Sequence, residues 1–528
     1  MSTATAELKP FETTVDQMLV HALAHWPDEL FIAADGVELT YAEVGARVDA
    51  LARGLTALGL APGDRVALWM SNIWEWVVAQ FAVTRCGAVL TPLNTRLRSD
   101  DLAHALHDSG ARFLVTQDHA GEFSYLATVR GLVESGRVPA LQQVVVARPA
   151  AGLTAPFLGW DDVLAHGQAS AAAPRPAQDP QQLAYILYTS GTTSLPKGVM
   201  LSHANLNNAF RTRRRLQRGD FNFLVFPLFA ITGCHNAVLG ALLVGAGLVL
   251  QQRFDAEEAI ELIERYRCKA LGAIVSVLPA LLQAMNFRAD RVASLEHLNV
   301  FPRRPQHVPL FQALGVQSVS AGYGMTETAG PLSFTEDMTD AGLRTEGTPW
   351  PGTALRIVDD AGQDLPDGSE GQILARSPQV MLGYFNQPEA TAQAIDVDGW
   401  LHTGDVGRRD AEGRITWVGR RSDVYKSSGF NVASAEVEAF LGQHPAVAEV
   451  AVIGVPDADK GEVGAAFVVA QPGQGIDLAG LRAFCQGQIA GYKTPGHVVV
   501  LPAFPKTTSG KVRKLELRAT HFGHLLSA

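Results

Sequence analysis

Strand patterns alternate with helix patterns along most of the chain, and this order constrains the fold more than any other feature. Thr40 and Glu43 form a capping box ahead of apolar residues at helical spacing. A Pro-Gly-Asp turn then leads into an apolar strand at 65–70, and a further helix and strand follow through 76–90. Alternation of this kind predicts an α/β fold with largely parallel sheets and helices on their faces. One such helix is expected at 256–266, with its apolar residues on one face.

Size and composition limit the classes of protein to consider. The 528 residues exceed one ordinary core and predict about three units of domain size, and 47% apolar residues allow a large interior. A net charge of −10 argues against a general nucleic-acid binder. The four cysteines are scattered without metal-ligand spacing, so we expect reduced core thiols.

Two segments bear on location and domain organisation. The start carries no basic-then-apolar pattern, and the longest apolar run, 237–250, contains glycines, so we expect a cytoplasmic protein with no membrane span. The Ala/Pro/Gly-rich stretch 147–180 is interpreted as a surface connection. After a polar stretch at 419–431, interpreted as a hinge, helices are expected at 433–441 and 478–489. Strands are expected there at 447–455, 465–470 and 497–501, which predicts a compact α+β unit.

The first chemical motif is YTSGTTSLPKGV at 188–199, a run rich in small hydroxyl residues. Glycine and hydroxyl side chains let a loop wrap an anion with N–H and O–H donors, and a lysine adds a point charge. The candidate anion-binding residues are Thr189, Ser190, Gly191, Thr192, Thr193 and Lys197. The spacing is not that of a P-loop, so a following helix is not predicted. An ordinary polar loop is the alternative, but the apolar strand expected at 183–187 favours a polyphosphate site.

The second motif is GYGMTET at 322–328. Two glycines around Tyr323 permit a tight turn that exposes an aromatic face to a base. Thr326 and Glu327 supply hard oxygens of the kind that hold Mg²⁺ against phosphate. A strand-end turn explains this motif when it is taken alone, whereas its pairing with the phosphate loop favours nucleotide binding.

Three further segments carry charge. Asp405 lies in GWLHTGDVG, where a carboxylate in a Gly-bounded turn can accept hydrogen bonds from two ribose hydroxyls; an ordinary Asx turn is the alternative. Lys511 lies in PKTTSGKVRK, where a flexible approach can bring an ammonium onto a phosphate or carboxylate; a basic tail is the alternative. The arginine-rich run 211–218 is interpreted as a solvated helix face, or else as a contact for a phosphorylated cosubstrate.

In their order along the chain, these motifs resemble those of the adenylate-forming superfamily, which includes acyl-CoA synthetases, luciferases and peptide-synthetase adenylation domains. The likeness rests on the phosphate loop, GYGMTET, WLHTGD and SGKVRK, and extends to GRRSDVYKSSGFNV at 419–432. It implies an α/β fold with a large N-terminal domain of layered sheets and helices, residues 1–420, that includes a small β-rich section. A small mobile α+β C-terminal domain would follow at 421–528.

The resemblance also implies roles for individual residues. Thr189 to Thr193 and Lys197 would hold the β and γ phosphates of ATP, while Tyr323 would lie against adenine. Thr326 would contact the α-phosphate and Glu327 would bind magnesium. Asp405 and Arg420 would bind the ribose. Lys511 would stabilise charge in the first transition state. Ser422 would be the hinge and Gly429 would line a CoA tunnel. The acyl pocket would include Phe229, Ala230, Gly322 and Gly324.

The sequence departs from the family pattern at four places. Ser194 replaces a usual glycine of the phosphate loop, and Ser422 replaces the commoner Asp or Lys of the hinge. Ala230 replaces a usual histidine and implies a wider or differently gated acyl pocket. The Gly-Gly-Ala-Pro turn is replaced by VFPRRP at 300–305, whose Arg303 and Arg304 are interpreted as surface-exposed, or else as partners of an anionic acyl group.

The implied activity is that of an ATP-dependent carboxylate–CoA ligase. It would use ATP, Mg²⁺ and coenzyme A to convert a small or medium organic acid, fatty, aromatic or alicyclic, first to acyl-AMP and then to acyl-CoA. The alternatives are an adenylating enzyme that passes its acyl group to an amine or a carrier protein, and a non-catalytic nucleotide-binding relative. The expected partner is a small carboxylic acid and not a nucleic acid, and a homodimer is compatible with the sequence.

Overall fold

The computed structural model describes residues 8–171, 175–189, 196–207, 216–427, 430–457, 460–486, 488–506 and 510–523. Its residues group into two compact units. One comprises most of the chain up to Thr353 together with Ser377–Gln393, and the other comprises Ala354–Arg376 and the residues from Ala394 onward. The second unit therefore takes in strands that precede the domain boundary expected at 420/421, and that boundary stays a prediction.

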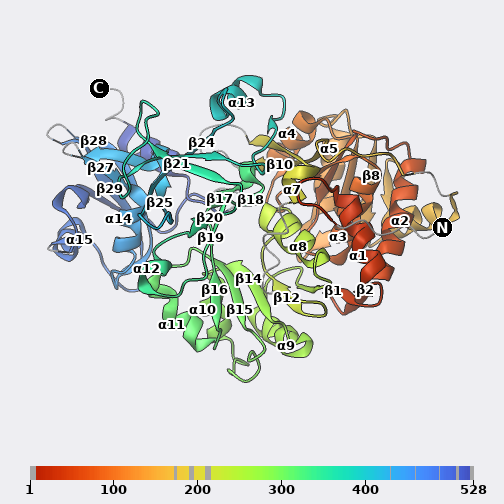
Figure 1. The fold of residues 1–528 in the computed structure, drawn as a ribbon, viewed down its shortest axis with the longest axis horizontal. Helices are drawn as coiled ribbons and strands as arrows, with labels where there is room; N and C mark the ends of the chain where they lie inside the picture. The colour runs from red at the N-terminus through yellow and green to blue at the C-terminus, as the bar shows by residue number, and fades with distance from the viewer. Residues whose placement is uncertain are drawn as a thin grey trace. The chain divides into compact units, whose positions relative to one another are not determined.

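Two mainly parallel sheets form the framework of the first unit (Figure 1). In the described part of the chain, the seven-stranded sheet has the order β16-β15-β14-β12-β13-β1-β2, in which only β2 runs antiparallel to its neighbour. Its strands are β1 (Leu30–Ala34), β2 (Val37–Thr40), β12 (Phe221–Leu224), β13 (Gly247–Leu250), β14 (Ala270–Ile274), β15 (His297–Phe301) and β16 (Ser318–Ser320).

The second sheet of this unit has eight strands among the described residues, in the order β23-β11-β10-β4-β3-β5-β8-β9. They are β3 (Arg65–Trp69), β4 (Val89–Pro92), β5 (Phe113–Gln117), β8 (Gln143–Ala147), β9 (Phe157–Gly159), β10 (Leu183–Thr189), β11 (Lys197–Ser202) and β23 (Gly383–Tyr384). Strands β4, β3, β5, β8 and β9 run parallel, and β10 joins them in parallel beside β4. The α/β architecture predicted from the alternation is confirmed.

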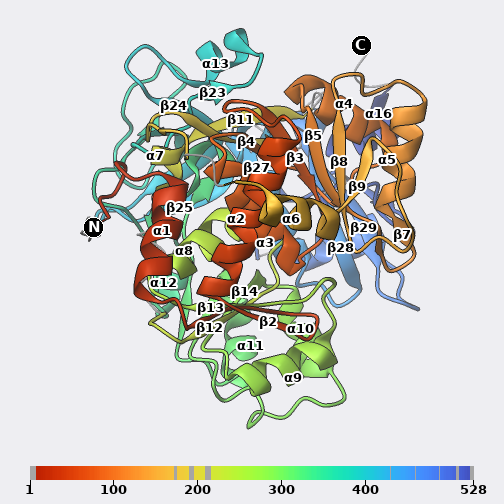
Figure 2. The same cartoon turned by 90° about the vertical axis from the view of Figure 1, so that its right-hand side faces the viewer.

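Helices cover these sheets where the sequence shows apolar stripes. The helices are α1 (Val15–His25), α2 (Tyr41–Ala57), α3 (Trp74–Arg85), α4 (Ser99–Ser109), α5 (Tyr125–Glu134), α6 (Trp160–Ala169), α7 (His203–Leu206), α8 (Val238–Leu242), α9 (Ala256–Tyr266), α10 (Val277–Gln283), α11 (Val308–Ala313), α12 (Asp340–Leu343) and α13 (Pro388–Ala394). Figure 2 shows α4 and α5 beside β5 and β8, where Leu102 and Val129 pack against Leu114. The capping box of Thr40 and Glu43 begins α2, and the helix expected at 256–266 is α9.

The interpretation of 147–180 as a surface connection is wrong. The stretch contains β9, which pairs with β8, and α6, which packs along α2. Two glycines permit the close helix contact, because a Cβ on Gly167 would collide with the carbonyl oxygen of Ala50 and one on Gly54 with the main chain of Val163. The small-residue composition of this stretch thus reflects close helix packing as well as loops.

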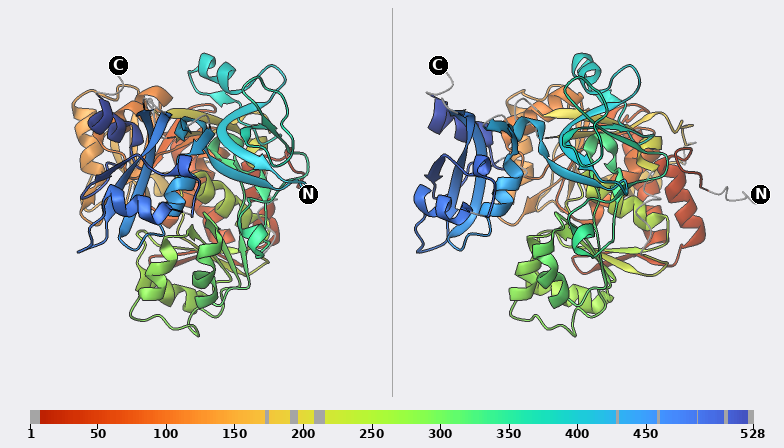
Figure 3. Two further views of the ribbon diagram at one scale, coloured as in Figure 1. Left: turned by 90° about the vertical axis from the view of Figure 1, so that its left-hand side faces the viewer. Right: turned by 60° about the vertical axis from the view of Figure 1, so that its left-hand side comes forward.

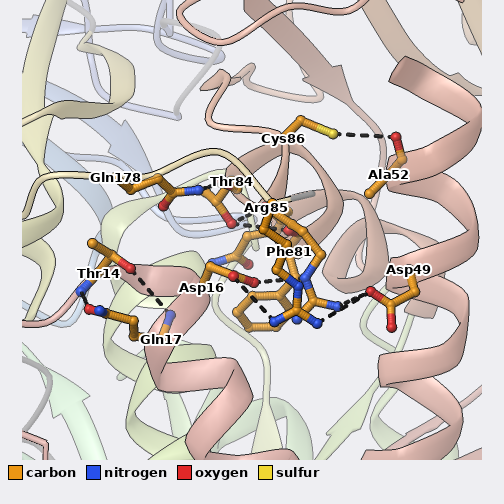
Figure 4. Close-up of polar contacts among 12 residues, drawn as sticks. Thr14, Asp16, Gln17, Asp49, Ala52, Phe81, Thr84, Arg85, Cys86 and Gln178 are labelled. Carbon is orange, nitrogen blue, oxygen red and sulfur yellow. Dashed lines mark hydrogen bonds and ion pairs between the residues drawn. The ribbon is translucent and has the colours of Figure 1, made fainter. Parts of the chain in front are cut away.

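A buried ion-pair cluster ties the N-terminal helix to this unit (Figure 4). The Arg85 guanidinium donates through Nε to Asp16 on α1 at 2.7 Å and through Nη1 to Asp49 on α2 at 2.6 Å. Gln178, at the end of the connection, donates its side-chain amide to the Thr84 carbonyl at 2.6 Å. All four cysteines are buried and free, as predicted.

The second unit contains two antiparallel arrangements. A four-stranded sheet has the order β21-β22-β24-β25, formed by Ala354–Val358, Gly371–Arg376, Leu401–Arg409 and Ile415–Arg420. The five-stranded sheet contains β26 (Val424–Ser427), β27 (Phe430–Ala433), β28 (Val447–Asp457), β29 (Gly461–Ala470) and β30 (His497–Val500). The polar stretch at 419–431, expected to be only a hinge, thus supplies the 3₁₀ turn η5 (Arg421–Asp423) and the hairpin β26-β27.

Helices lie on either side of the strands β28 and β29, drawn in blue in Figure 3, and alternate residues of these strands pack against opposite layers of helix. Val452 and Val468 pack with α14 (Ser434–Leu441) and α15 (Leu478–Cys485). Ile453 and Phe467 pack with α16 (Lys514–Phe522) on the other side. The α+β unit is confirmed, although the helix expected at 478–489 ends at Cys485. Among the described residues, no helix combines the length and apolar character that a bilayer crossing requires.

Candidate active site

The phosphate-loop motif connects two antiparallel strands. β10 ends at Thr189 and β11 begins at Lys197, and these two residues are directly paired across the hairpin. The strand expected before the motif is confirmed, and the absence of a following helix agrees with the rejection of a P-loop. The loop residues themselves, Ser190, Gly191, Thr192, Thr193 and Ser194, lie outside the described residues.

Lys197 and Glu327 are linked through a tyrosine that the sequence analysis missed. The Tyr384 hydroxyl donates to Glu327 Oε1 at 3.0 Å, and the Lys197 ammonium lies 4.8 Å from the centroid of the Tyr384 ring. Tyr384 is held there because β23 pairs with β11, opposite Val199. A lone tyrosine at 384 carries no spacing signal, since only the pairing of β23 brings it beside the two motifs.

The GYGMTET motif folds into a short hairpin followed by a 3₁₀ turn. Gly324 and Met325 form β17, which pairs with Gly330–Pro331, and Thr326–Thr328 form the turn η4. The glycines at 322 and 324 allow the following chain to approach, because a Cβ on Gly324 would collide with the carbonyl oxygen of Gly330 and one on Gly322 with that of Ser333. Their need for glycine therefore has a packing reason independent of any acyl pocket.

Within this turn the two predicted ligand residues are arranged differently. Glu327 is 7% exposed and its main-chain oxygen accepts from Met381 N at 2.8 Å, which fixes its backbone, while the Tyr384 hydroxyl fixes its carboxylate. Thr326 is half-buried. Tyr323 is only 5% exposed, which differs from the openly displayed aromatic face that the motif suggests, and its place beside adenine stays a prediction. The Tyr323 amide donates to the Ser333 hydroxyl at 3.0 Å, which fixes the main chain at this point.

The interpretation of Arg303 and Arg304 as surface-exposed is wrong. Arg303 is 1% exposed and donates to the carbonyl oxygens of Val319 and Gly342, each at 2.8 Å. Burial lowers the pKa of its guanidinium to about 10. Arg304 is half-buried and pairs with Glu346 at 2.8 Å. The two arginines thus brace the turn after β15 in place of small residues, and the partners they contact belong to the protein itself.

The predicted acyl-pocket residues share one edge of the seven-stranded sheet. Phe229 and Ala230 follow the carboxyl end of β12, and Gly322 and Gly324 follow that of β16. Between them in the sheet, β14 and β15 end in apolar residues that stay accessible: Ile274 is 50% exposed and Phe301 is 37% exposed. Phe301 stacks on Phe226, with ring centroids 5.0 Å apart. Ligands of parallel α/β sheets bind at this edge.

A π-helical turn, Thr232–Ala237, directly follows Phe229 and Ala230. Turns of this type occur frequently at functional sites. His235 within it is fully buried, its ring contacts the Leu206 carbonyl at 2.5 Å and Asn236 Oδ1 at 2.6 Å, and burial lowers its pKa to about 4. A neutral histidine therefore braces this edge. The sequence analysis missed it because a π-turn leaves no periodic signal.

The ribose-binding candidates lie in the second unit. Asp405 and Arg420 are cross-strand partners on β24 and β25, with Arg420 Nε 2.9 Å from Asp405 Oδ1. Asp405 is 3% exposed and its amide donates to the Thr403 hydroxyl at 3.1 Å. The expectation of a turn at Asp405 is wrong, since the residue lies inside a nine-residue strand. The neighbouring Gly404, with φ of +71°, marks a local irregularity in that strand.

Lys511 lies between Lys506 and Val512, which form a bridge across the base of a loop whose residues 507–509 lie outside the described part of the chain. Gly510, beside Lys511, has φ of +85°, a conformation that favours glycine. Lys511 is exposed. Ser422 has its backbone in η5, and its side chain, like the whole of Gly429, lies outside the described part of the chain.

Comparison with known proteins identifies the family. The AMP-binding enzyme family matches residues 19–385, and the AMP-binding enzyme C-terminal domain matches 436–511. A methyl-dioxo-octahydroindenyl-propanoyl:CoA ligase of Mycobacterium tuberculosis is 36% identical over 519 residues, which cover 96% of this chain and 98% of the relative.

Solved structures agree with that result. The anthranilate CoA ligase AuaEII in complex with anthranoyl-AMP superimposes with a TM-score of 0.85 at 27% identity, covering 98% of this chain and 99% of the other. The o-succinylbenzoate CoA synthetase of Bacillus subtilis in complex with ATP and magnesium gives 0.80 at 27% identity, covering 95% and 99%. The chain therefore belongs to the AMP-binding enzyme family, and within it to the acyl-CoA ligase branch. The resemblance drawn from the motifs is confirmed.

Proposed function

We propose that this protein is an AMP-forming acid–CoA ligase for a carboxylic acid with an apolar, ring-bearing body. In the first step a carboxylate oxygen attacks the α-phosphorus of ATP and pyrophosphate leaves. In the second step the CoA thiol attacks the acyl carbon and AMP leaves. The observation that carries the proposal is the Lys197–Tyr384–Glu327 contact, because it joins a phosphate-loop lysine to the carboxylate expected to face the metal.

The residues of the first unit fit a magnesium nucleotide. Mg²⁺ in such sites is held by one or two carboxylates together with substrate phosphates, and Glu327 supplies one carboxylate whose position is fixed by Tyr384. When bound, the ion would neutralise charge that develops on the phosphates. Lys197 would hold the β and γ phosphates with Thr189 to Thr193, Thr326 would contact the α-phosphate, and Tyr323 would lie against adenine.

The residues of the second unit supply the remaining contacts. Asp405 would accept hydrogen bonds from the ribose, with Arg420 orienting its carboxylate through their ion pair. Lys511 would place its ammonium on charge that develops during acyl-AMP formation. Rotation about Ser422 would remove Lys511 before the second step, and Gly429 would line the path of the CoA thiol. We also propose that the protein forms a homodimer and is located in the cytoplasm.

The apolar strand ends support the choice of acid. Phe229, Ile274 and Phe301 offer aromatic and branched aliphatic surface at the edge where Ala230 leaves additional room, and the buried Phe226 stacks behind Phe301. The arginines at 303 and 304 already have protein partners, so nothing there favours a second carboxylate on the substrate. The relatives named above act on a bicyclic propanoate and on aromatic acids, which agrees with an apolar ring in the pocket.

Product analysis tests the proposal. The protein would be incubated with MgATP, CoA and a pooled library of aliphatic, aromatic and alicyclic acids, with a control lacking CoA, and the products identified by mass spectrometry. We expect one class of ring-bearing acyl-CoA with stoichiometric AMP. Accumulation of acyl-AMP with CoA ignored would point to an amine or carrier protein as acceptor, and the absence of any acyl-AMP would overturn the assignment.

A further inference from the structure

The loop that carries Lys511 is anchored by cations on both of its arms. On the outgoing arm, Lys506 pairs with Glu449 of β28 at 2.6 Å. On the returning arm, Lys514 lies 2.7 Å from Glu438 of α14 and 3.3 Å from Asp423 of η5. All of these residues belong to the second unit.

The contacts of Lys514 differ from an ordinary surface pair. Its side chain is 21% exposed, and those of Glu438 and Asp423 are 22% and 34% exposed, so the group is partly shielded from solvent. Glu438 Oε1 also accepts from the main-chain N–H of Val452 at 2.7 Å, which ties the same carboxylate to β28. A shared ammonium thus joins α16, α14 and η5, with β28 attached through Glu438. Networks of this kind hold geometry better than isolated exposed pairs.

The position of Asp423 places this network next to the predicted hinge. Asp423 is the residue after Ser422, the predicted hinge, and Lys514 is three residues after Lys511. Between Lys511 and Lys514 the chain is fixed by the Lys506–Val512 bridge and by the Arg513 amide, which donates to Pro505 O at 2.8 Å. Ion pairs and hydrogen bonds therefore connect η5, next to the predicted hinge, to the start of α16 and so to Lys511.

We propose that Lys514 is a positioning residue for acyl-AMP formation, which acts by holding the Lys511 loop in register with the turn after the hinge. This inference rests on the proposed role of Lys511. Lys514 does not touch substrate in this account, and removing it would leave two carboxylates facing each other without their common cation. The turn η5, which carries Asp423, would then separate from α16, and Lys511 would lose its fixed position.

The packing of α16 against the sheet does not depend on Lys514. Leu517 and Phe522 of α16 are 3% and 7% exposed and pack with Val463, Ala465 and Phe467, so the hydrophobic contact survives loss of the ion pairs. A change in rate without a large change in melting temperature is therefore the expected signature.

The test measures both half-reactions on Lys514→Met in the full-length enzyme. Acyl-AMP formation, followed by acid-dependent pyrophosphate exchange, should fall in kcat by roughly tenfold or more, with KM for ATP within about twofold, because a small misplacement of a catalytic group costs that much. Conversion of supplied acyl-AMP to acyl-CoA should stay within about twofold, since Lys511 is not used there. Lys514→Arg should restore most of the rate.

Two comparisons make the outcome decisive. Arg513→Met is the matched control, because it removes a neighbouring cation whose ion-pair partner among the described residues is the exposed Glu516 at 3.5 Å, and its rates should match wild type. In a Lys511→Ala background, Lys514→Met should cause no additional loss of acyl-AMP formation. Equal loss of both half-reactions, additive loss with Lys511→Ala, or unchanged adenylation would overturn the inference. If Lys511→Ala itself adenylates normally, the proposed role of Lys511 fails instead, whatever Lys514 does.

Discussion

The carboxylate of Glu327 and the ammonium of Lys511 are held in place by opposite means. Glu327 is 7% exposed, lies on a 3₁₀ turn at the end of a hairpin, and takes a hydrogen bond from a tyrosine of another strand. Lys511 is exposed, and its loop is secured by cation–carboxylate pairs around its base. On the proposed roles, the carboxylate that would bind magnesium is set in buried structure, whereas the ammonium that would act in acyl-AMP formation lies on a solvent-facing loop anchored at its base.

The largest effect should come from the buried carboxylate. Glu327→Gln keeps the size of the side chain and its acceptor for Tyr384 but removes the negative charge, so acyl-AMP formation should fall about 100-fold or more. Pyrophosphate exchange measured across a magnesium titration is the assay, and the apparent magnesium requirement should rise. If activity stays within a few-fold of wild type, Glu327 does not face the metal, and its buried position has no role in catalysis to compare with that of Lys511.

The first unit, which holds Glu327, should also lose folding stability in acid. Burial lowers the pKa of His203 and of His235 to about 4 from 6.5. Below pH 6.5 the unfolded chain takes up protons that the folded chain refuses, so stability should decrease as pH falls from 6.5 to 4, by up to about 3 kcal/mol for each histidine. Denaturant unfolding at several pH values should show that the free energy of unfolding depends less steeply on pH in His235→Gln than in wild type. The exposed His166 is the control, and an unchanged slope in His235→Gln would contradict the assignment.

The Asp405–Arg420 pair of the second unit, in which the carboxylate is buried, tests whether burial of a charge or the unit to which it belongs determines its effect. Asp405→Ala removes the partner of Arg420 and the proposed ribose acceptor, so KM for ATP should rise roughly 10- to 100-fold, the worth of hydrogen bonds to a charged group. Preference for ATP over 3′-deoxy-ATP should disappear in the same variant. Asp410→Asn, which alters a half-buried pair with Arg414 in the same sheet region, should leave both quantities unchanged. Retained preference for ATP in Asp405→Ala would assign ribose recognition elsewhere.

The smallest effect should come from the residue that links lysine and glutamate. Tyr384→Phe keeps the ring beside Lys197 but removes the hydroxyl on Glu327, which is worth about 1 kcal/mol, or roughly fivefold in acyl-AMP formation. The thioester step with supplied acyl-AMP serves as the internal reference. A loss as large as that of Glu327→Gln would mean that Tyr384 has a direct role in chemistry.

Local sequence patterns predicted the strands and helices well and predicted long-range contacts poorly. The capping box at Thr40, the stripe of α9 and the strand before the phosphate loop each depend on neighbouring residues, and each is present. Tyr384 reaches Glu327 only through the pairing of β23 with β11, a contact that no local pattern encodes.

The errors have the same origin. A pair of arginines followed by proline has the composition of a surface turn, but Arg303 is buried because it finds carbonyl oxygens on β16 and α12, far along the chain. Gly404 beside Asp405 predicts a turn, yet its positive φ is accommodated within a strand that pairs on both sides. The roles of Gly429 and Ser422 stay predictions from the family resemblance.

The proposed role of Lys511 is tested most directly by assaying the two half-reactions of Lys511→Ala separately. We expect acid-dependent pyrophosphate exchange to be lost, while the conversion of supplied acyl-AMP and CoA to acyl-CoA stays close to wild type. Equal loss of both half-reactions, or normal exchange, would contradict the assignment of Lys511 to the first step.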